Sequence, residues 1–469
     1  MGNSNASARA AEWKGPFSDQ EYDCLMAKFK DVTSAAASVP DVQARLQSLL
    51  RVPLSTSVPD EYSSRIRQLG VAFHELCLYT REMEGRDSTS RMLQPIDFVQ
   101  TVAACVRSSS QTVVRCLFRL FADSDSASIS ENELTQLLLA ILIMANESKS
   151  SSSSVEEEDP QSTLDVAKKL ASAAVEYSTS STASRQLTTD EFIRWFSAQF
   201  PLFYSVFVSW LGARCFGAIA RPLYNPPRLS HKSDIISSAH FVSLSAVANP
   251  IQNSLYRLYT SAQDGLSFNR LSFHLLGYTG PTLVIIQDTE GAVFGMFCDS
   301  EWKESTRPYG GNGCFLFRLE PEINIYRLTA SASSGSNSNS EGGFMYLNSK
   351  GYSLPRGIGM GGTTSKFRLF LSEDLDESSY TITKCMSFES GRLSTKENFI
   401  IEAMEVWGCG DEDDVLHQRA FRKDTTEMIN RARKVDKAQF VGSDFDKEMF
   451  LGKTFGHGSD QARVVDDEH

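Results

Sequence analysis

The fold is decided by Leu283-Val284-Ile285-Ile286-Gln287-Asp288-Thr289-Glu290-Gly291-Ala292-Val293-Phe294-Gly295-Met296-Phe297, in which a short polar turn joins two apolar runs. Apolar runs of this length on either side of Asp, Thr, Glu and Gly are typical of two β-strands joined in a hairpin. A second pair of such runs lies at 314–319 and 323–328, and residues 367–371 alternate as a half-buried strand does. Residues 271–410 are therefore predicted to form a module rich in β-strands.

Short segments of this module carry a family resemblance. They are Phe273-His274-Leu275-Leu276 with Gly280-Pro281, residues 291–297, Asn312-Gly313-Cys314-Phe315-Leu316-Phe317, Tyr346-Leu347-Asn348, Gly359-Met360-Gly361-Gly362 and Glu405-Val406-Trp407-Gly408. In their order and spacing they resemble the TLDc family over residues 241–410. The resemblance implies a two-sheet antiparallel β-sandwich flanked by helices, which acts as a binding module.

The resemblance also implies partners. Members of the TLDc family are tied to oxidative-stress resistance and to the vacuolar or lysosomal proton pump, the V-ATPase. A helical first half and a start suited to acylation resemble the lysosome-associated, mTOR-linked branch of the family. The chain is therefore expected to be a cytoplasmic, non-enzymatic adaptor that binds V-ATPase subunits, peripheral on the lysosomal or vacuolar membrane.

Length and composition bound the function further. A chain of 469 residues exceeds the usual size of one domain, so two or three domains are expected. The formal charge of -12 argues against a protein whose main role is to bind nucleic acid. The nine cysteines are widely spaced and form no C-x-x-C pair, so they are predicted to be reduced core residues.

The first half is predicted to be helical, which makes the whole chain α+β. Ser18-Asp19-Gln20-Glu21 is a capping box that starts a helix, and further helices are expected at about 41–50, 61–83, 95–107 and 111–122. The predicted order is a flexible start at 1–16, an EF-hand-like helical domain at 17–220, a linker at 221–240, the TLDc domain at 241–410, a helix at 411–440 and a flexible tail at 441–469. Residues 148–160 are expected to be a solvated loop, and residues 252–260 are expected to be the first helix of the TLDc stretch.

One stretch of the helical half resembles an EF-hand loop that has lost calcium. With Ile129 as the eighth loop residue, Ser124, Ser126 and Glu133 occupy positions three, five and twelve. Calcium needs several carboxylate oxygens, but position one is Ala122, and an alanine also takes the glycine place at position six. Loss of calcium binding is the favoured interpretation, and weak binding is the alternative.

A second stretch, centred on Leu187, gives the same result. It places Ser180 at position one and Glu191 at position twelve, with hydroxyls at the places between. Glu191 alone retains a calcium ligand type. A calcium-responsive protein is therefore kept as an alternative function. It would require calcium-binding loops, which this chain lacks.

The chain opens Met1-Gly2-Asn3-Ser4-Asn5-Ala6-Ser7, where Gly2 and the small polar residues after it favour N-myristoylation. The strict motif fails because Ala6 stands where serine or threonine is preferred, so an unmodified start is the alternative. One acyl chain binds membranes only marginally, so anchoring would need a protein partner. Residues 1–14 lack the apolar core of a secretory signal, and residues 204–220 are predicted to be a buried helix, so the chain is not expected to be integral to a membrane.

No catalytic or metal-binding constellation is predicted, and no cofactor. Gly357-Ile358-Gly359-Met360-Gly361-Gly362 matches the dinucleotide pattern, but a strand is expected after it where a helix is needed, so a glycine turn that allows close packing is favoured. The seven histidines show no metal-ligand spacing, and His274 is predicted to be structural. A thiol-dependent antioxidant protein is a further alternative, and it would require a reactive thiolate.

The residues after Gly410 are predicted to form a helix. Acidic residues at 411–414 begin the segment, and basic residues at 431–437 end it, which is the order that a helix dipole favours. Its apolar stripe is narrow, so resting on the domain and reaching for a partner remain equally open. If the helix binds a partner, the expected anchors are Leu416, Met428 and Val435.

Overall fold

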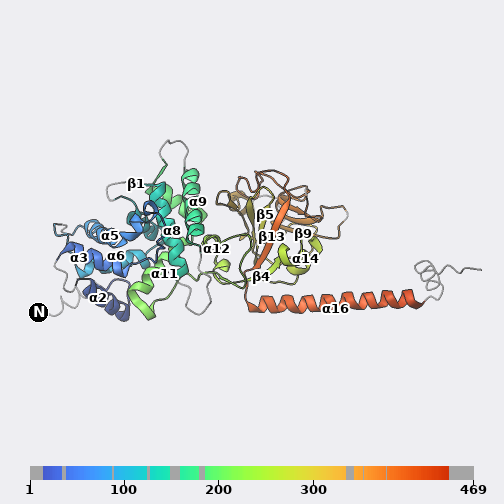
Figure 1. The fold of residues 1–469 in the computed structure, drawn as a ribbon, viewed down its shortest axis with the longest axis horizontal. Helices are drawn as coiled ribbons and strands as arrows, with labels where there is room; N and C mark the ends of the chain where they lie inside the picture. The colour runs from blue at the N-terminus through green and yellow to red at the C-terminus, as the bar shows by residue number, and fades with distance from the viewer. Residues whose placement is uncertain are drawn as a thin grey trace, which may run out of the picture.

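The computed structural model describes residues 14–33, 38–86, 89–123, 127–147, 159–178, 185–333, 343–351, 353–376 and 378–442, with side chains of the last helix described to 431. Figure 1 shows a helical half, a β-rich half beside it and one long helix that extends away from the β-rich half. The predicted α+β class, with helices first, sheets second and a C-terminal helix, is confirmed.

The first half of the chain is helical, as predicted. Its elements are α2 (Asp19–Thr33), α3 (Val39–Leu49), η1 (Asp60–Tyr62), α4 (Ser64–Arg67), α5 (Leu69–Met83), α6 (Pro95–Val106), α7 (Ser110–Phe121), α8 (Glu131–Glu147), α9 (Pro160–Ser178), α10 (Thr189–Gln199), α11 (Phe203–Phe216) and η2 (Gly217–Ile219). The capping box before α2 is present, because Ser18 N donates to Glu21 Oε2 at 2.9 Å and Glu21 N donates back to Ser18 Oγ.

Two features of the helical half depart from prediction. The helix expected at 61–83 is divided into η1, α4 and α5. Within α5, Gly70 allows a close approach to α3, since a Cβ there would lie 2.2 Å from Gln47 N. The helix α9 was not predicted. It begins at Pro160 and packs small residues such as Ala167, Ala171 and Ala174 against α8. The loop predicted at 148–160 lies outside the described residues up to position 158.

The β-rich half holds two sheets. The larger has the strand order β3-β4-β13-β5-β6-β7-β8 and the smaller β12-β11-β10-β9. The bounds are β3 (Arg228–Leu229), β4 (Ser254–Thr260), β5 (Thr282–Asp288), β6 (Val293–Cys298), β7 (Phe315–Glu320), β8 (Asn324–Tyr326), β9 (Met345–Asn348), β10 (Gly357–Thr363), β11 (Lys366–Ser372), β12 (Tyr380–Thr381) and β13 (Ile401–Gly408). The flanking helices are α12 (Ser238–Ser245), η3 (Asn249–Gln252), α13 (Ser261–Asp264), α14 (Phe268–Leu275), α15 (Ala330–Ser333) and α16 (Glu412–Gly442).

The larger sheet is buried on both faces. Along β5, Leu283 and Ile285 belong to a core shared with α12 and the helical half, whereas Val284 and Ile286 belong to the core between the two sheets. Successive strand residues point to opposite faces, so a strand covered on both sides reads as a continuous apolar run. This double cover explains why residues 283–286 are apolar at every position.

Two predictions in this half are wrong. Residues 252–260 form no helix, because Ser254–Thr260 is the strand β4, paired with β13 through Tyr256 and Arg257. The segment Gly357–Thr363 is the strand β10 and not a glycine turn. Its glycines do allow close packing, since a Cβ on Gly359 would lie 2.6 Å from the ring of Phe367. The next element is the strand β11, so the helix required for dinucleotide binding is absent from this place.

The two halves are joined through α12 and the edge of the larger sheet. Lys169 of α9 forms an ion pair with Glu320 of β7. Ile325 N donates to Gln199 Oε1 at 3.0 Å, and Arg327 Nε donates to Ala198 O at 2.7 Å. Residues 221–240, predicted as a linker, contain β3 and the first turn of α12, so they are part of this junction.

Glu405 is the buried acceptor that fastens this junction to the sheet. Its Oε2 accepts from Ser233 Oγ at 2.7 Å and from Trp407 Nε1 at 2.9 Å, and its Oε1 accepts from Asp234 N at 2.7 Å. The Trp407 ring in turn packs edge-on against Phe241 of α12, with 5.3 Å between ring centroids. One carboxylate thus joins the segment before α12 to the last strand.

We expect Glu405→Ala to lower the free energy of unfolding by about 3 kcal/mol, because it leaves two buried donors and one partly buried donor without an acceptor. The melting temperature should fall by roughly 5 to 10 °C. Glu402→Ala is the matched control, since Glu402 lies on the same strand with an exposed side chain. Equal melting temperatures for the two variants would contradict the role given to Glu405.

Candidate functional site: an EF-hand-like loop pair and a projecting helix

The two predicted loops lie side by side, as EF-hand loops do. The short strands β1 (Ser128–Ser130) and β2 (Gln186–Thr188) pair antiparallel, with Ile129 opposite Leu187. These are the two residues assigned to the eighth loop position, and both are fully buried. The pairing of these loops supports the EF-hand-like interpretation of the helical half.

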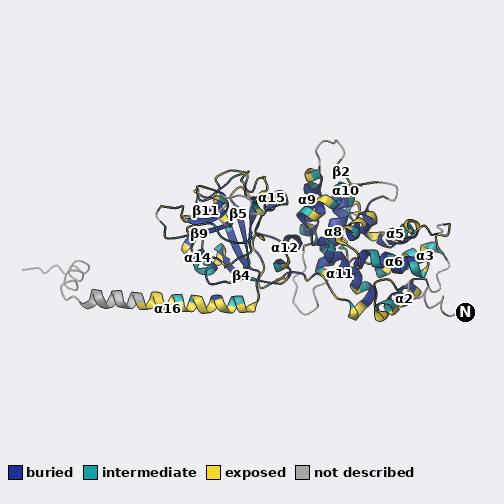
Figure 2. Cartoon of the chain, turned by 180° about the vertical axis from the view of Figure 1, so that it is seen from behind, coloured by how far each residue is buried: buried dark blue, intermediate teal, exposed yellow. Residues whose placement is uncertain are grey.

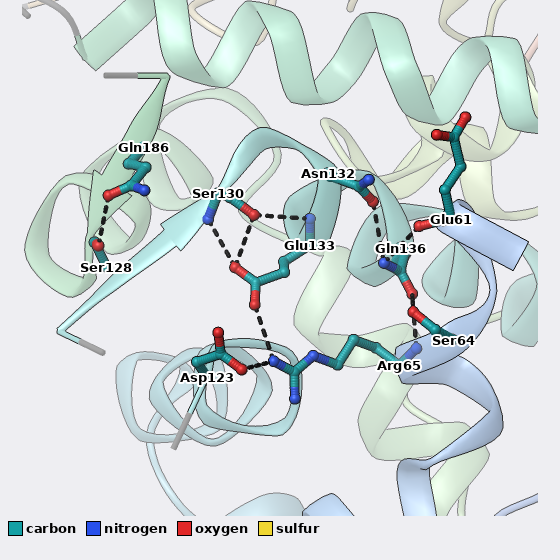
Figure 3. Close-up of a pocket in the computed structure, with 10 residues that line it drawn as sticks. All are labelled: Glu61, Ser64, Arg65, Asp123, Ser128, Ser130, Asn132, Glu133, Gln136 and Gln186. Carbon is teal, nitrogen blue, oxygen red and sulfur yellow. Dashed lines mark hydrogen bonds and ion pairs between the residues drawn. The ribbon is translucent and has the colours of Figure 1, made fainter. Parts of the chain in front are cut away.

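The glutamate at the end of the first loop is occupied by protein groups. Glu133 Oε2 accepts from Ser130 N at 2.9 Å and from Ser130 Oγ at 2.8 Å, which caps the start of α8. Glu133 Oε1 accepts from Arg65 Nη2 at 3.1 Å (Figure 3). Ser124 and Ser126, the other residues of the predicted loop, lie outside the described residues. The bidentate carboxylate that calcium would need is therefore already engaged.

Arg65 supplies a positive charge inside this loop. Its guanidinium lies between Asp123 and Glu133, and its backbone N donates to Gln136 Oε1 at 2.8 Å (Figure 3). Gln136 Nε2 also donates to Glu61 O at 3.0 Å, so one side chain holds the short helix α4 in place. A guanidinium held between two carboxylates replaces the charge of a cation and cannot dissociate from the chain. No local sequence pattern indicates this contact, because Arg65 is distant in the chain from both carboxylates.

These side chains line a polar hollow of about 450 Å³. Its lining is Glu61, Ser64, Arg65, Asp123, Ser128, Ser130, Asn132, Glu133, Gln136 and Gln186. In the part of the chain that the structure describes, no group of three or more His, Cys, Asp or Glu residues is arranged to hold a metal ion. The hollow is thus a hydrogen-bonded support for the loop pair.

The second loop uses its glutamate in the same way. Thr188 N and Thr188 Oγ1 donate to Glu191 Oε2 at 2.9 and 2.7 Å, and the reciprocal bond from Glu191 N completes a capping box at α10. The bond from the Thr188 backbone N–H is the main cause that lowers the pKa of the Glu191 carboxyl. Ser180, the predicted first ligand, lies outside the described residues.

The C-terminal helix α16 docks on the TLDc stretch through polar contacts. Asp414 accepts from Thr279 Oγ1, His417 Nδ1 bonds to Gly277 O at 2.9 Å, and the nearly buried Gln418 donates to His274 O. The ring of Phe421 lies against Gly277, where a Cβ would be 2.5 Å from the ring. The base of the helix is therefore fixed to the loop between α14 and β5.

Beyond its base, α16 extends past the domain as an arm, which we define as residues 423–442. Positions 414, 418 and 421 of the docking face are spaced four and three apart, and the same spacing continues through 425, 428, 432 and 435. Met428 continues the docking face and is 69% exposed. Figure 2 shows the described residues of α16 as mainly exposed. Up to residue 431, the last with a described side chain, this face thus continues outward along the helix, and Met428 on it is exposed.

The three predicted anchors differ in place. Met428 lies on the continuing face, and Val435 holds the next heptad position, although side chains beyond 431 are not described. Leu416 is 57% exposed but lies about 120° around the helix from Met428, so one flat partner surface would not take both. Phe421 was missed as a contact residue, because sequence does not show that Gly277 leaves room for its ring.

Two further residues singled out from the sequence are Gly2 and His274. Gly2 lies outside the described residues. His274 Nδ1 bonds to Leu258 O at 2.6 Å, and burial lowers the pKa of its imidazole.

Among the described residues, no single helix is both long and apolar enough to cross a membrane. One pair of helices, Thr189–Gln199 and Phe203–Ile219, bent by 99°, passes that test together by length and composition.

Comparison with known proteins defines the class. Residues 229–410 match the TLDc domain, so this part of the chain is a TLDc domain. It is similar to MTOR-associated protein MEAK7 of Gallus gallus, at 36% identity over 162 residues, which cover 34% of this chain and 32% of the relative. It is also similar to MEAK7 of Mus musculus, at 31% over 223 residues covering 45% and 47%. Oxidation resistance protein 1 of Xenopus tropicalis matches at 29% over 184 residues, covering 39% and 19%. The matches thus span about a third to a half of the length of the MEAK7 relatives.

We expect calcium at about 1 mM to leave the melting temperature unchanged, because Glu133 and Glu191 are already bonded within the protein. Arg65→Ala should lower the melting temperature, since it leaves two carboxylates without their cation. Arg67→Ala is the matched control, because Arg67 pairs with Asp60 at the exposed surface. A saturable stabilisation at micromolar calcium would contradict the closed-loop interpretation.

We expect Gly277→Ala to loosen the base of α16, because its Cβ would overlap the Phe421 ring. Hydrogen exchange of the amides at 416–424 should speed up. Gly291→Ala is the matched control: Gly291 has φ +83°, close to the +81° of Gly277, but nothing lies within 4 Å of its added Cβ. Faster exchange in both variants would show that backbone strain, and not the Phe421 contact, controls docking.

Proposed function

We propose that this chain is a non-enzymatic adaptor that binds the vacuolar or lysosomal V-ATPase through its TLDc domain and the arm of α16. The observation that carries the proposal is the docking face of α16, which continues beyond the domain with Met428 exposed. An amphipathic helix lies on a partner through anchors of this spacing, and a few such anchors dominate the binding energy.

The TLDc domain supports the choice of partner. The TLDc resemblance implies V-ATPase binding, and the matched region at 229–410 includes the surface on which α16 docks. The names of the relatives point to association with mTOR and to oxidation resistance for those proteins. We extend both to this chain as a proposed link to mTOR signalling and to oxidative-stress resistance.

A cytoplasmic protein that is peripheral on the lysosomal or vacuolar membrane fits this role. An N-myristoyl group on Gly2 would supply part of the membrane affinity, and one acyl chain alone gives only marginal binding. Contacts with the pump would supply the remaining membrane affinity. Neither the acyl group nor these contacts would be sufficient alone, so binding to the membrane would be reversible.

A calcium-responsive protein is the less favoured function. A sensor needs carboxylates that calcium can reach, whereas Glu133 is bonded to Arg65 and Ser130, and Glu191 is bonded to Thr188. Calcium would have to displace the guanidinium of Arg65, which is covalently part of the chain, from the first loop. The loop pair is better suited to hold α4, α8 and α10 in one arrangement.

We expect Met428→Asp to weaken retention on purified V-ATPase by at least about tenfold, because a charge would enter the apolar face of the arm. Asn430→Asp adds the same charge on the opposite face of the helix and is the matched control. The melting temperatures of both variants should equal that of the parent, since both side chains are exposed. Unchanged retention of Met428→Asp would remove the arm from the interface, and no retention of the parent protein would reject the pump as the partner.

A further inference from the structure

A threonine lies on the apolar face of the arm. Thr425 holds the place between Phe421 and Met428 in the four-and-three spacing along which the docking face continues. Thr425 is half-buried, whereas Phe421 and Met428 are exposed. Thr425 Oγ1 donates to Phe421 O at 2.8 Å, within the helix. A hydroxyl group therefore lies on the face through which the arm is proposed to bind its partner.

Basic residues come shortly before this threonine. Arg422 precedes Thr425 by three residues, Lys423 by two and Arg419 by six. One class of protein kinases, which we call arginine-directed, selects an arginine three residues before the acceptor hydroxyl, because carboxylates of the kinase form paired hydrogen bonds with its guanidinium. The order of residues from Arg419 to Thr425 is thus a substrate sequence for an arginine-directed kinase.

A kinase binds its acceptor segment in an extended form, so the helix must open locally at Thr425. Among the described residues, the hydrogen bonds, ion pairs and ring contacts that join α16 to the domain end at Arg422, whose guanidinium carbon lies 4.8 Å from the centroid of the Phe273 ring. The bonds of Thr425 and Thr426 are made within the helix. A helical segment without such tertiary contacts opens at little cost in free energy. The arm can therefore unwind around Thr425 while the base of α16 stays docked.

We propose that Thr425 is phosphorylated by an arginine-directed protein kinase and that the phosphate closes the face of the arm to a partner. The Thr425 hydroxyl oxygen would attack the γ-phosphorus of ATP, and the bond from that phosphorus to the β–γ bridging oxygen would break. ADP would leave, and the hydroxyl proton would pass to the catalytic base of the kinase. The position of the modification is argued from this chain alone, whereas its effect on a partner rests on the proposed function.

The phosphate would act on the arm in two ways. It adds a charge of about -1.5 to -2 between the apolar side chains of Phe421 and Met428, and a partner would have to bury that charge to cover them. It also lies one helical turn from Arg422, and residues three apart on a helix are neighbours. A bond from Arg422 to the phosphate competes with its contact to the Phe273 ring. Phosphorylation would thus block the arm and loosen the end of its base.

The next residue provides an internal comparison. Thr426 Oγ1 donates to Arg422 O at 2.7 Å, as Thr425 does to the carbonyl four residues before it. Thr426 is exposed, and it lies about 160° around the helix from Met428. A charge on Thr426 therefore has the same chemistry as one on Thr425 but lies on the opposite face of the arm.

The first test treats the full chain with Mg-ATP and the catalytic subunit of cyclic-AMP-dependent protein kinase, which is arginine-directed. Trypsin cleaves after Lys423 and Arg431, so both threonines fall in one peptide, and electron-transfer fragmentation assigns the phosphate to one of them. We expect phosphate on Thr425, and a rate at least about tenfold lower in Arg422→Gln. Phosphate confined to Thr426, no phosphate on either threonine, or an equal rate in Arg422→Gln would overturn the proposal.

The second test compares Thr425→Asp with Thr426→Asp for retention on purified V-ATPase. We expect Thr425→Asp to be retained at least about tenfold more weakly, and equal retention of the two variants would overturn the effect on the partner. If the parent protein itself is not retained, the proposed function fails and hydrogen exchange decides instead. The amides at 416–424 should then exchange faster in the chain phosphorylated on Thr425 than in the unmodified chain, and equal exchange would overturn the proposal.

Discussion

The structure depends on a central sheet that must be covered on both faces. Leu283 and Ile285 require apolar partners on one side, and Val284 and Ile286 require them on the other. The smaller sheet covers the second face, and α12 with the helical half covers the first. Because exposure of either face would cost about 25 cal/mol for each Å² of apolar surface, the helical half stabilises the TLDc domain, although it lies outside the matched residues 229–410. Glu405 lies at this junction and accepts hydrogen bonds from donors that would otherwise be left without a partner by the packing.

The closed loop pair suits this structural role. A calcium sensor changes its helix arrangement when an ion binds or leaves, and a helical half that also covers a sheet could not move in this way without exposing it. Arg65 removes the dependence on an ion, since its guanidinium is attached to the chain and is always charged. Lys169 and Arg327 then connect the helices to the sheet edge through Glu320 and Ala198. The bonded glutamates of the loop pair and the contacts with the sheet therefore both hold the helices in one arrangement.

Much of the fold could be predicted from the sequence, and the failures have physical causes. Strands such as β5 and β6 were found because apolar runs and turn residues are local signals. The strand β4 was taken for a helix, because its register with β13 depends on a partner that is distant in the chain. The helix α9 was missed, since alanines that pack on α8 give a weak apolar pattern. Arg65 and Gln418 could not be found at all, because polar contacts between distant segments leave no periodic trace.

The base of α16 shows why its arm can serve a partner. Docking depends on side chains such as Asp414, His417 and Gln418, and on the ring of Phe421 against Gly277. Hydrogen bonds of this kind contribute about 1 kcal/mol each, so the base is held firmly enough to fix a direction without being part of either sheet core. A partner that covers Met428 would add apolar burial to a face that is already aligned by the base. Binding would then avoid most of the entropy cost of ordering a free helix, because the domain has already ordered its first turns.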